Sequence, residues 1–289
     1  MIWKLGIIGG SGLYDLPGLE NIRKQAVETP WGAPSGELTL GTLAGTELVF
    51  LPRHGPGHRL PPNHINFRAN IAALKMAGCT DIVSISACGS LKEELHPGRF
   101  VAVDQYIDRT TSRVNSFFEA GCAAHVSVAE PVCSRLAGLA ADAAEAAGAP
   151  VTRGGTYLAM EGPQFSSRAE SALYRSWGCD VIGMTNMPEA RLAREAELPY
   201  ASIAMVTDYD SWNEKEAAVD VPAVLAVMAQ NSRIARTSIA RLAEMVSDMD
   251  RTPSPQGIET ALDTAIITAP HARDPVLVEK LRAIAGRVL

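Results

Sequence analysis

Two carboxylates, Asp208 and Asp210, directly follow the apolar stretch 200–206, and their type and spacing suggest chemistry. Side chains two positions apart on an extended chain point the same way, so both acids would face one pocket where a buried strand ends. In open α/β sheets, ligands bind at that end of the strands. Two acids on one wall suit a ligand that donates N–H groups or needs a proton. In the alternative interpretation, Asp208 caps the next helix and Asp210 is solvated, because aspartate is common in turns.

Two further segments have the residue types of an anion site. The glycines of Gly9–Gly12 would let backbone N–H groups approach an anion, and Ser11 adds a hydroxyl donor. Their spacing matches neither the dinucleotide fingerprint nor the P-loop, and an ordinary strand-to-loop turn is the alternative. Arg53 and His54 follow another apolar run, and the fork of donors on an arginine suits phosphate.

The histidines of the same segment raise the question of a metal. His54, His58 and His64 could supply three nitrogen ligands. The glycines and Pro56 prevent a helix there, and no cluster of Asp or Glu completes a ligand set. No metal site is therefore predicted, and a structural loop with solvated histidines remains the alternative to an anion clamp.

Three more segments end apolar runs with polar or aromatic residues. Small residues follow one run at 86–90, and a polar loop carries Phe165, which could stack on a flat ring, and Ser166, which could bond to its edge. Met184 and Thr185 follow another run and could supply an apolar wall and a hydroxyl. Strand ends at one edge of a parallel sheet converge, so these signals together predict one composite site.

Composition narrows the class of protein. The chain has 289 residues, 47% of them hydrophobic, which is typical of a globular protein with a large core. A net charge of −6 argues against general binding to nucleic acid or anionic membrane. We find neither a transmembrane segment nor a signal peptide. The five cysteines are scattered and odd in number, so we expect reduced thiols in the cytoplasm, with Cys88 structural.

The periodicity of apolar residues predicts alternating strands and helices. Strands are expected at 5–8, 47–51, 82–86, 100–103, 180–184 and 202–206, and helices at 63–77, 134–147, 188–196, 221–247 and 274–288. Segment 37–51 has the pattern of a hairpin around Ala44-Gly45, and 251–257 that of a loop. The prediction is an α/β fold in which a central mixed, largely parallel sheet is flanked by helices. No linker is evident, so residues 1–289 are expected to form a single domain.

Several long motifs resemble one family. The segments IIGGSGLYDLPGL, LPRHGPGHRLPPNHINFRAN, EGPQFSSRAES, GMTNMPEARLAREAELPYA and VTDYDSW are similar to those of the methylthioadenosine phosphorylase family, in the trimeric purine nucleoside phosphorylase superfamily. The match runs from Gly6 to about Leu225. The resemblance implies a nucleoside phosphorylase-like fold and the phosphorolysis of 5′-methylthioadenosine to adenine and 5-methylthioribose 1-phosphate. It also implies purine and methionine salvage, a homotrimer or a dimer of trimers, and inorganic phosphate as co-substrate with no metal or organic cofactor.

The resemblance also implies roles for individual residues. A phosphate site would comprise Ser11, Arg53, His54, Ser86, the backbone N–H of Ala87, and Thr185. Met184 would touch the ribose, Phe165 would stack on the base, and the base edge would meet Ser166, Asp208, Tyr209 and Asp210. The methylthio pocket would be lined by His58, Val221, Val224 and Leu225, and His125 would be lent to the neighbouring subunit's site.

The implied chemistry assigns the two acids different tasks. The glycosidic bond breaks toward an oxocarbenium-like sugar, so adenine leaves more easily if its N7 is protonated. Burial raises the pKa of an aspartic acid, so Asp208 could supply this proton near neutral pH. Asp210 would support it and accept from the 6-amino group. An ionised carboxylate there would repel the oxygen of a 6-oxopurine, so adenine is the expected base.

Three alternatives remain open from the sequence. A phosphorylase that prefers 6-oxopurines is the nearest, and a catalytically silent nucleoside sensor on the same fold is the second. A nicotinamide-linked oxidoreductase is the third, but its glycine fingerprint is lacking. The chain also departs from animal relatives at Gly183, Asn186 and Pro188, which leaves the ribose contacts open. The segment after Asp250 cannot be matched residue by residue.

Overall fold

The computed structural model describes residues 2–10, 13, 15–213 and 221–289, with side chains from residue 224 onward in the last range. In these ranges eleven strands form one mixed sheet, and parallel pairings outnumber antiparallel ones. The strands are β1 (Lys4–Gly9), β2 (Glu20–Gln25), β3 (Leu38–Leu43), β4 (Thr46–Pro52), β5 (Asp81–Ser90), β6 (Phe100–Val103), β7 (Gln105–Asp108), β8 (Val151–Arg153), β9 (Thr156–Ala159), β10 (Val181–Gly183) and β11 (Tyr200–Asp208).

Strand β5 is the hub of the sheet. It pairs in parallel with β1 and β11 and antiparallel with β10, and β1 in turn pairs in parallel with β4. All but the last residue of β11 are buried, as expected for a largely apolar strand covered on both faces. Because β1, β4, β5 and β11 run in the same direction, their carboxyl ends meet at one edge.

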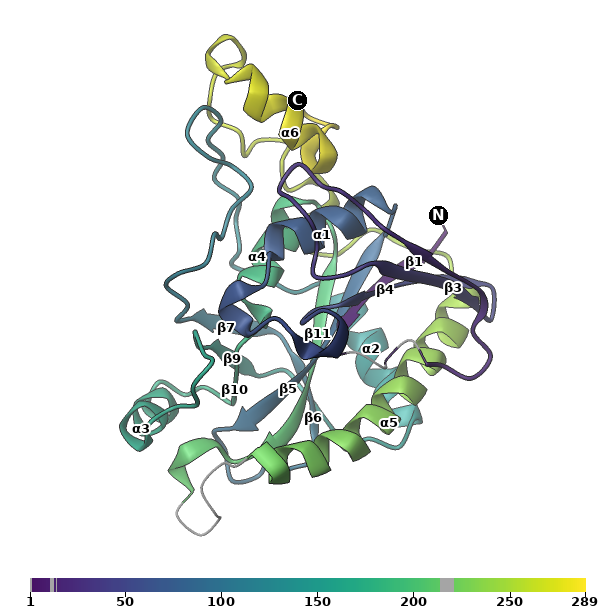
Figure 1. Cartoon of the computed structure of the whole chain (residues 1–289), viewed down its shortest axis with the longest axis vertical. Coiled ribbons are helices and arrows are strands. Elements are labelled where there is room, and N and C mark those ends of the chain that lie inside the picture. Colours follow the sequence, from purple (N-terminus) through teal and green to yellow (C-terminus); the bar gives the residue numbers. More distant parts are fainter. Residues whose placement is uncertain (1, 11–12, 14, 214–220) are drawn as a thin grey trace.

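Helices cover both faces of this sheet (Figure 1). Helices α2 (Ser134–Ala146) and α5 (Val221–Ser247) pack together on one face. Helices α1 (Phe67–Met76) and α4 (Asn186–Glu195) pack on the other, and α6 (Pro275–Ala285) packs against α1. Helix α3 (Arg168–Ser176) lies apart, where it contacts the short 3-10 helix η3 (Asp210–Trp212). The sheet and its two helical layers confirm the predicted fold class.

Most of the predicted elements are present at nearly the predicted positions. The hairpin of β3 and β4 turns at Ala44 and Gly45, whose φ angles of 49° and 84° fit a primed turn. Helix α5 has the predicted bounds, whereas α4 begins at Asn186 rather than Pro188, with a non-helical Met187 in its first turn.

The sequence prediction missed four strands and one helix. Strand β2 is polar and fully exposed, so no apolar run marks it, and β7, β8 and β9 have only three or four residues. Helix α3 follows the predicted polar loop 161–168, and the sequence analysis predicts no helix there. Its capping box, in which Ser167 and Glu170 bond reciprocally, was a usable signal.

Two expectations about the class of protein can also be compared with the structure. Within the described ranges, no helix is both long and apolar enough to cross a membrane. All five cysteines are buried with free thiols, and burial raises the pKa of Cys88 well above its usual value. A thiol that resists ionisation is a poor nucleophile, which agrees with a structural role for Cys88.

Candidate active site

Asp208 and Asp210 lie together at the end of β11, but not by strand alternation. The strand ends at Asp208, and Asp210 has a φ of 51° at the start of η3, so the chain between them turns. Within this turn the backbone N–H of Asp210 donates to Asp208 Oδ1 at 2.8 Å, and the Thr207 hydroxyl donates to Asp208 Oδ2 at 2.7 Å. Asp208 thus accepts a hydrogen bond within the turn but is not the N-cap of η3, which is Tyr209, so the alternative interpretation is wrong for Asp208. It is also wrong for Asp210, which is 8% exposed and not solvated.

Both acids lie against Gly89 of β5. A Cβ atom on Gly89 would lie 2.9 Å from Asp208 Oδ1 and 3.3 Å from Asp210 Cβ. Only a residue without a side chain lets the two carboxyl groups sit this close to the strand. Both acids therefore pack directly against the carboxyl end of β5.

Burial disfavours the ionised form of both groups. Burial raises the pKa of Asp208, although the hydrogen bonds from Thr207 and from the backbone N–H of Asp210 act to lower it. Burial also raises the pKa of Asp210. Asp210 Oδ2 is buried and makes no hydrogen bond within the part of the chain that the structure describes. A ligand that donates to this oxygen would remove an unfavourable contact, since an unpaired buried acceptor costs about 1–3 kcal/mol.

Arg53 is held by a carboxylate that the sequence analysis did not identify. The guanidinium, 2% exposed, donates from Nε to Glu189 Oε2 at 2.9 Å and from Nη2 to Glu189 Oε1 at 3.1 Å. Nη2 also donates to Ser84 Oγ, and Nη1 donates to the Ile85 carbonyl at 3.0 Å. The Arg53 guanidinium therefore lies next to the ends of β1 and β5. Glu189 of α4 sets its orientation.

His54 is expected to be neutral near pH 7. Burial lowers its pKa to about 4, and Nδ1 lies 2.9 Å from the Leu60 carbonyl. Because a carbonyl only accepts, Nδ1 must carry the proton, so Nε2 of the neutral ring is an acceptor. The exposed His58 ring stacks on His54 with centroids 4.0 Å apart.

The polar residues of β5 and α4 meet in a buried network. Ser86 Oγ donates to Asn186 Oδ1 at 3.2 Å, and Asn186 Nδ2 donates to the hydroxyls of Tyr106 and Ser202. Thr185 is the residue that precedes α4 and is also buried. The Ser86 end of the predicted anion site is therefore held by Asn186.

The base-side loop packs against the segment before α4. A Cβ on Gly162, where φ is 68°, would lie 2.5 Å from Met184 Sδ. Ser166 is buried and its carbonyl accepts from Ser211 Oγ at 2.6 Å, which ties the loop to η3. Phe165 is 46% exposed and leaves a ring face open.

Gly183 also has a structural explanation. A Cβ there would lie 1.8 Å from Tyr157 Oη, so the phenol occupies the space that a side chain at position 183 would need.

Not every predicted residue can be assigned to this cluster. Ser11 and the side chain of Val221 lie outside the described residues. Leu225 is exposed near the start of α5, with Val224 partly buried beside it. His125 is exposed on the long segment between β7 and α2, where its backbone N–H donates to the Ala265 carbonyl at 2.9 Å. Tyr209 Oη donates to the Glu93 carbonyl at 3.4 Å.

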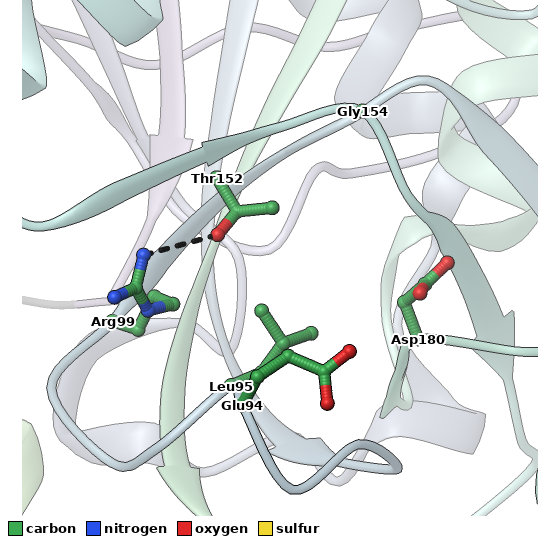
Figure 2. A pocket seen from close by; sticks show the side chains of 6 residues that line it. All are labelled: Glu94, Leu95, Arg99, Thr152, Gly154 and Asp180. Carbon is green, nitrogen blue, oxygen red and sulfur yellow. Dashed lines mark hydrogen bonds between the residues drawn. The ribbon is translucent and has the colours of Figure 1, made fainter.

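The cavity in Figure 2 does not coincide with this cluster. It has a volume of about 230 Å³ and is lined by Glu94, Leu95, Arg99, Thr152, Gly154 and Asp180. Arg99 donates to Thr152 Oγ1 at 3.2 Å, as the dashed line in Figure 2 marks. None of the predicted site residues lines it, and its mixed charges suggest no reaction. We therefore take the strand-end cluster, rather than this cavity, as the candidate active site.

The described side chains do not favour a metal. Within the described ranges, no three His, Cys, Asp or Glu side chains are grouped so that they could hold an ion. The candidate site thus combines one buried and one partly buried acid with a buried arginine and several hydroxyls. Such a set suits a neutral ring with N–H donors beside an oxyanion.

This chain is similar to known proteins over nearly its whole length. The phosphorylase superfamily model matches residues 4–246. An S-methyl-5′-thioadenosine phosphorylase of Bradyrhizobium diazoefficiens is 58% identical over 285 residues, which cover 99% of this chain and 98% of that protein. The protein of the same name from Rhodospirillum rubrum is 54% identical over 285 residues, with 99% and 97% covered.

Solved structures give the same picture. A methylthioadenosine phosphorylase from an antarctic soil metagenomic library is 43% identical, with a TM-score of 0.91 over 98% of this chain and 99% of that one. A variant of the adenosine/methylthioadenosine phosphorylase of Schistosoma mansoni, solved in complex with methylthioadenosine, is 36% identical with a TM-score of 0.81. In that case 90% of this chain and 96% of the other are covered.

Proposed function

Because this chain belongs to the phosphorylase superfamily and, within it, to the S-methyl-5′-thioadenosine phosphorylases, we propose that it works through the strand-end cluster described above. The reaction is the phosphorolysis of 5′-methylthioadenosine, a pentosyl transfer to phosphate. A phosphate oxygen bonds to C1′ as the C1′–N9 bond breaks, and the bond's electrons pass to the purine. The observation that carries our assignment is the pair of acids, partly buried Asp208 and buried Asp210, against Gly89.

We assign the leaving-group proton to Asp208. Its pKa is raised by burial, so a fraction of the carboxyl group is protonated at higher pH than in water. General acid catalysis of this kind contributes about 10²–10⁴-fold. Asp210, with its unpartnered Oδ2, accepts from the 6-amino group of adenine. Phe165 stacks on the purine, Ser166 and Tyr209 flank its edge, and Met184 meets the ribose.

The phosphate is proposed to bind between Arg53, the hydroxyls of Ser11, Ser86 and Thr185, and the backbone N–H of Ala87. Among the described contacts, Arg53 Nη1 donates once, to the Ile85 carbonyl, and this nitrogen carries a second N–H. His54 Nε2, an acceptor in the neutral ring, suits the hydroxyl of a monoprotonated phosphate. This arrangement supports in-line attack by positioning and charge stabilisation.

The remaining parts of the assignment concern the 5′ group and the assembly. We propose that His58, Val221, Val224 and Leu225 line the methylthio pocket, and that the exposed His125 reaches a neighbouring subunit of a homotrimer. Neither a metal nor an organic cofactor is part of the proposal. We place the enzyme in the cytoplasm, in purine and methionine salvage, with nucleoside and phosphate as its small-molecule partners.

A substrate panel tests the proposal. Methylthioadenosine, methylthioinosine, adenosine and inosine are incubated with and without phosphate, and the free base and the ribose 1-phosphate product are quantified. We expect adenine from methylthioadenosine, only when phosphate is present, with a 1:1 yield of 5-methylthioribose 1-phosphate. Faster release of hypoxanthine would overturn the adenine assignment. Tight binding without any phosphorylated sugar would identify a sensor instead.

A further inference from the structure

Arg113 joins the two halves of the site through its whole guanidinium group. Nη1 donates to the carbonyls of Met184 at 2.6 Å and Met187 at 2.7 Å. Nη2 donates to the carbonyls of Glu161 at 2.7 Å and Met160 at 3.4 Å, and Nε donates to Glu161 Oε1 at 3.1 Å. A guanidinium carries five N–H donors, so all five are engaged, and all of them point at two short segments.

These two segments hold opposite ends of the proposed substrates. Met160 and Glu161 lead into the base-side loop that carries Phe165 and Ser166. Met184 and Met187 flank Thr185 at the start of α4, on the ribose and phosphate side.

The position of Arg113 is itself fixed by an aromatic ring and by an ion pair. Its side chain is 2% exposed, and its guanidinium lies 5.2 Å from the ring centroid of Phe67. The Glu161 carboxylate also accepts from the backbone N–H groups of Thr111 and Ser112 and from the Ser112 hydroxyl. Burial opposes ionisation of Glu161, but these hydrogen bonds outweigh it and lower its pKa to about 2. The ion pair is therefore present at any physiological pH.

We propose that Arg113 is a positioning residue that sets the distance between the purine and the phosphate. This inference rests on the proposed function of the same site. Arg113 touches no substrate; it fixes four backbone carbonyls, and through them the two loops that do. A lysine could not replace it, because a point charge on a flexible stem cannot serve carbonyls on two sides at once.

The expected effect follows from the geometry of displacement at C1′. The acid, the C1′ atom and the attacking oxygen must stay aligned, and a shift of about 1 Å can cost roughly 10²-fold in rate. Loosening the clamp should change the spacing of the two half-sites, so the affinities for nucleoside and for phosphate should fall together. A residue that only stabilised the fold would lower the melting temperature and leave both kinetic constants of the folded protein unchanged.

The test compares Arg113→Lys with the matched control Arg68→Lys. Arg68 is a partly exposed arginine that pairs with Glu119 on the same long segment, outside the site. For each variant, kcat and the KM values for methylthioadenosine and phosphate are measured at least 10 °C below its melting temperature. Glu161→Gln provides a milder second perturbation, because the four carbonyl contacts of Arg113 remain. Calorimetric binding of adenine and of phosphate to each protein gives a readout that does not require turnover.

For Arg113→Lys we expect kcat to fall about 100-fold with both KM values raised, a smaller change of the same kind for Glu161→Gln, and wild-type constants for Arg68→Lys. Unchanged constants, or a rise in only one KM, would overturn the proposal. If wild-type protein releases no adenine, the proposed function fails, and the binding data then decide the role of Arg113 alone. Weaker binding of both adenine and phosphate would support it, and loss of only one or of neither would refute it.

Discussion

Replacing Glu189 with methionine should lower the free energy of unfolding. The loss should exceed the net contribution of the intact Glu189–Arg53 ion pair to stability. Glu189 is fully buried and accepts from Arg53 Nε and Nη2, from Ser84 Oγ at 2.7 Å and from Tyr200 Oη at 2.8 Å. Removing the carboxylate leaves a guanidinium, 2% exposed, without its counter-ion. Breaking a buried pair in this way costs about 3–5 kcal/mol.

A double-mutant cycle separates this penalty from simple loss of packing. Arg53→Met alone leaves the Glu189 charge buried without its partner and should also cost about 3–5 kcal/mol, whereas the double variant has no charge at either position. Only the lost acceptor for Ser84 and Tyr200 then remains, at about 1–3 kcal/mol per group. At the midpoints of these ranges the single losses sum to about 8 kcal/mol and the double variant loses about 4 kcal/mol. The loss in the double variant should therefore fall short of the sum by about 4 kcal/mol.

The assay is urea unfolding, with thermal unfolding as a second measure. A loss of 3–5 kcal/mol in a chain of this size lowers the melting temperature by roughly 6–10 °C, at about 2 °C per kcal/mol. The control is the same cycle on Arg282 and Glu279, an exposed pair on α6, which should show a coupling of about 0–1 kcal/mol. Additive losses at Arg53 and Glu189 would refute the argument that Glu189 holds the arginine's charge in place.

Three other predictions concern the acids and the loops. Gly89→Ala would bring a Cβ to 2.9 Å from Asp208 Oδ1, so kcat should fall about tenfold or more with little change in the phosphate KM. The control is Gly138→Ala, which should leave the kinetics unchanged because no atom lies within 4 Å of its Cβ. Glu161, with its pKa lowered to about 2 from 4.5, should make the wild type more stable than Glu161→Gln above pH 4.5, and urea titrations should show this advantage shrinking as the pH falls toward 2. Burial raises the pKa of Glu195 from 4.5 to about 7, so this residue should show the opposite pH dependence. The stability of the wild type relative to Glu195→Gln should decline from about pH 4.5 to 7 and then level off. A difference that does not change with pH would argue against an ionising buried carboxyl.

Local pattern was sufficient to predict the buried strands and most helices. Strand β11 and the hairpin at Ala44-Gly45 have strong signals in apolar runs and turn residues, whereas β2 is a polar, exposed strand held by pairing with β3. For Asp208 and Asp210, the sequence analysis correctly predicts that the two carboxyl groups lie together, but its reason is incomplete. Alternation along a strand does place residues two apart on one side, but a turn at Asp210, with its positive φ, is what brings the two carboxyl groups over Gly89.

The residues that the sequence analysis missed act over long distances in the chain. Glu189 lies 136 positions from Arg53, and Arg113 lies 71 positions from Met184. Nothing local distinguishes Glu189 from a solvated helix residue, and its burial follows only from how α4 packs on β5 and β11. Groups that touch a ligand come from strand ends and leave local signals, whereas the groups that orient them depend on the topology.

The most direct test of the central claim compares wild type and Asp208→Asn on two substrates, methylthioadenosine and its N7-methylated analogue. The analogue already carries a positive charge on the purine, so its departure needs no proton. We expect Asp208→Asn to lower kcat for methylthioadenosine by about 10²–10⁴-fold, and to leave kcat for the N7-methylated analogue and the phosphate KM nearly unchanged. Equal losses on both substrates, or full turnover of methylthioadenosine, would contradict the assignment of the proton to Asp208.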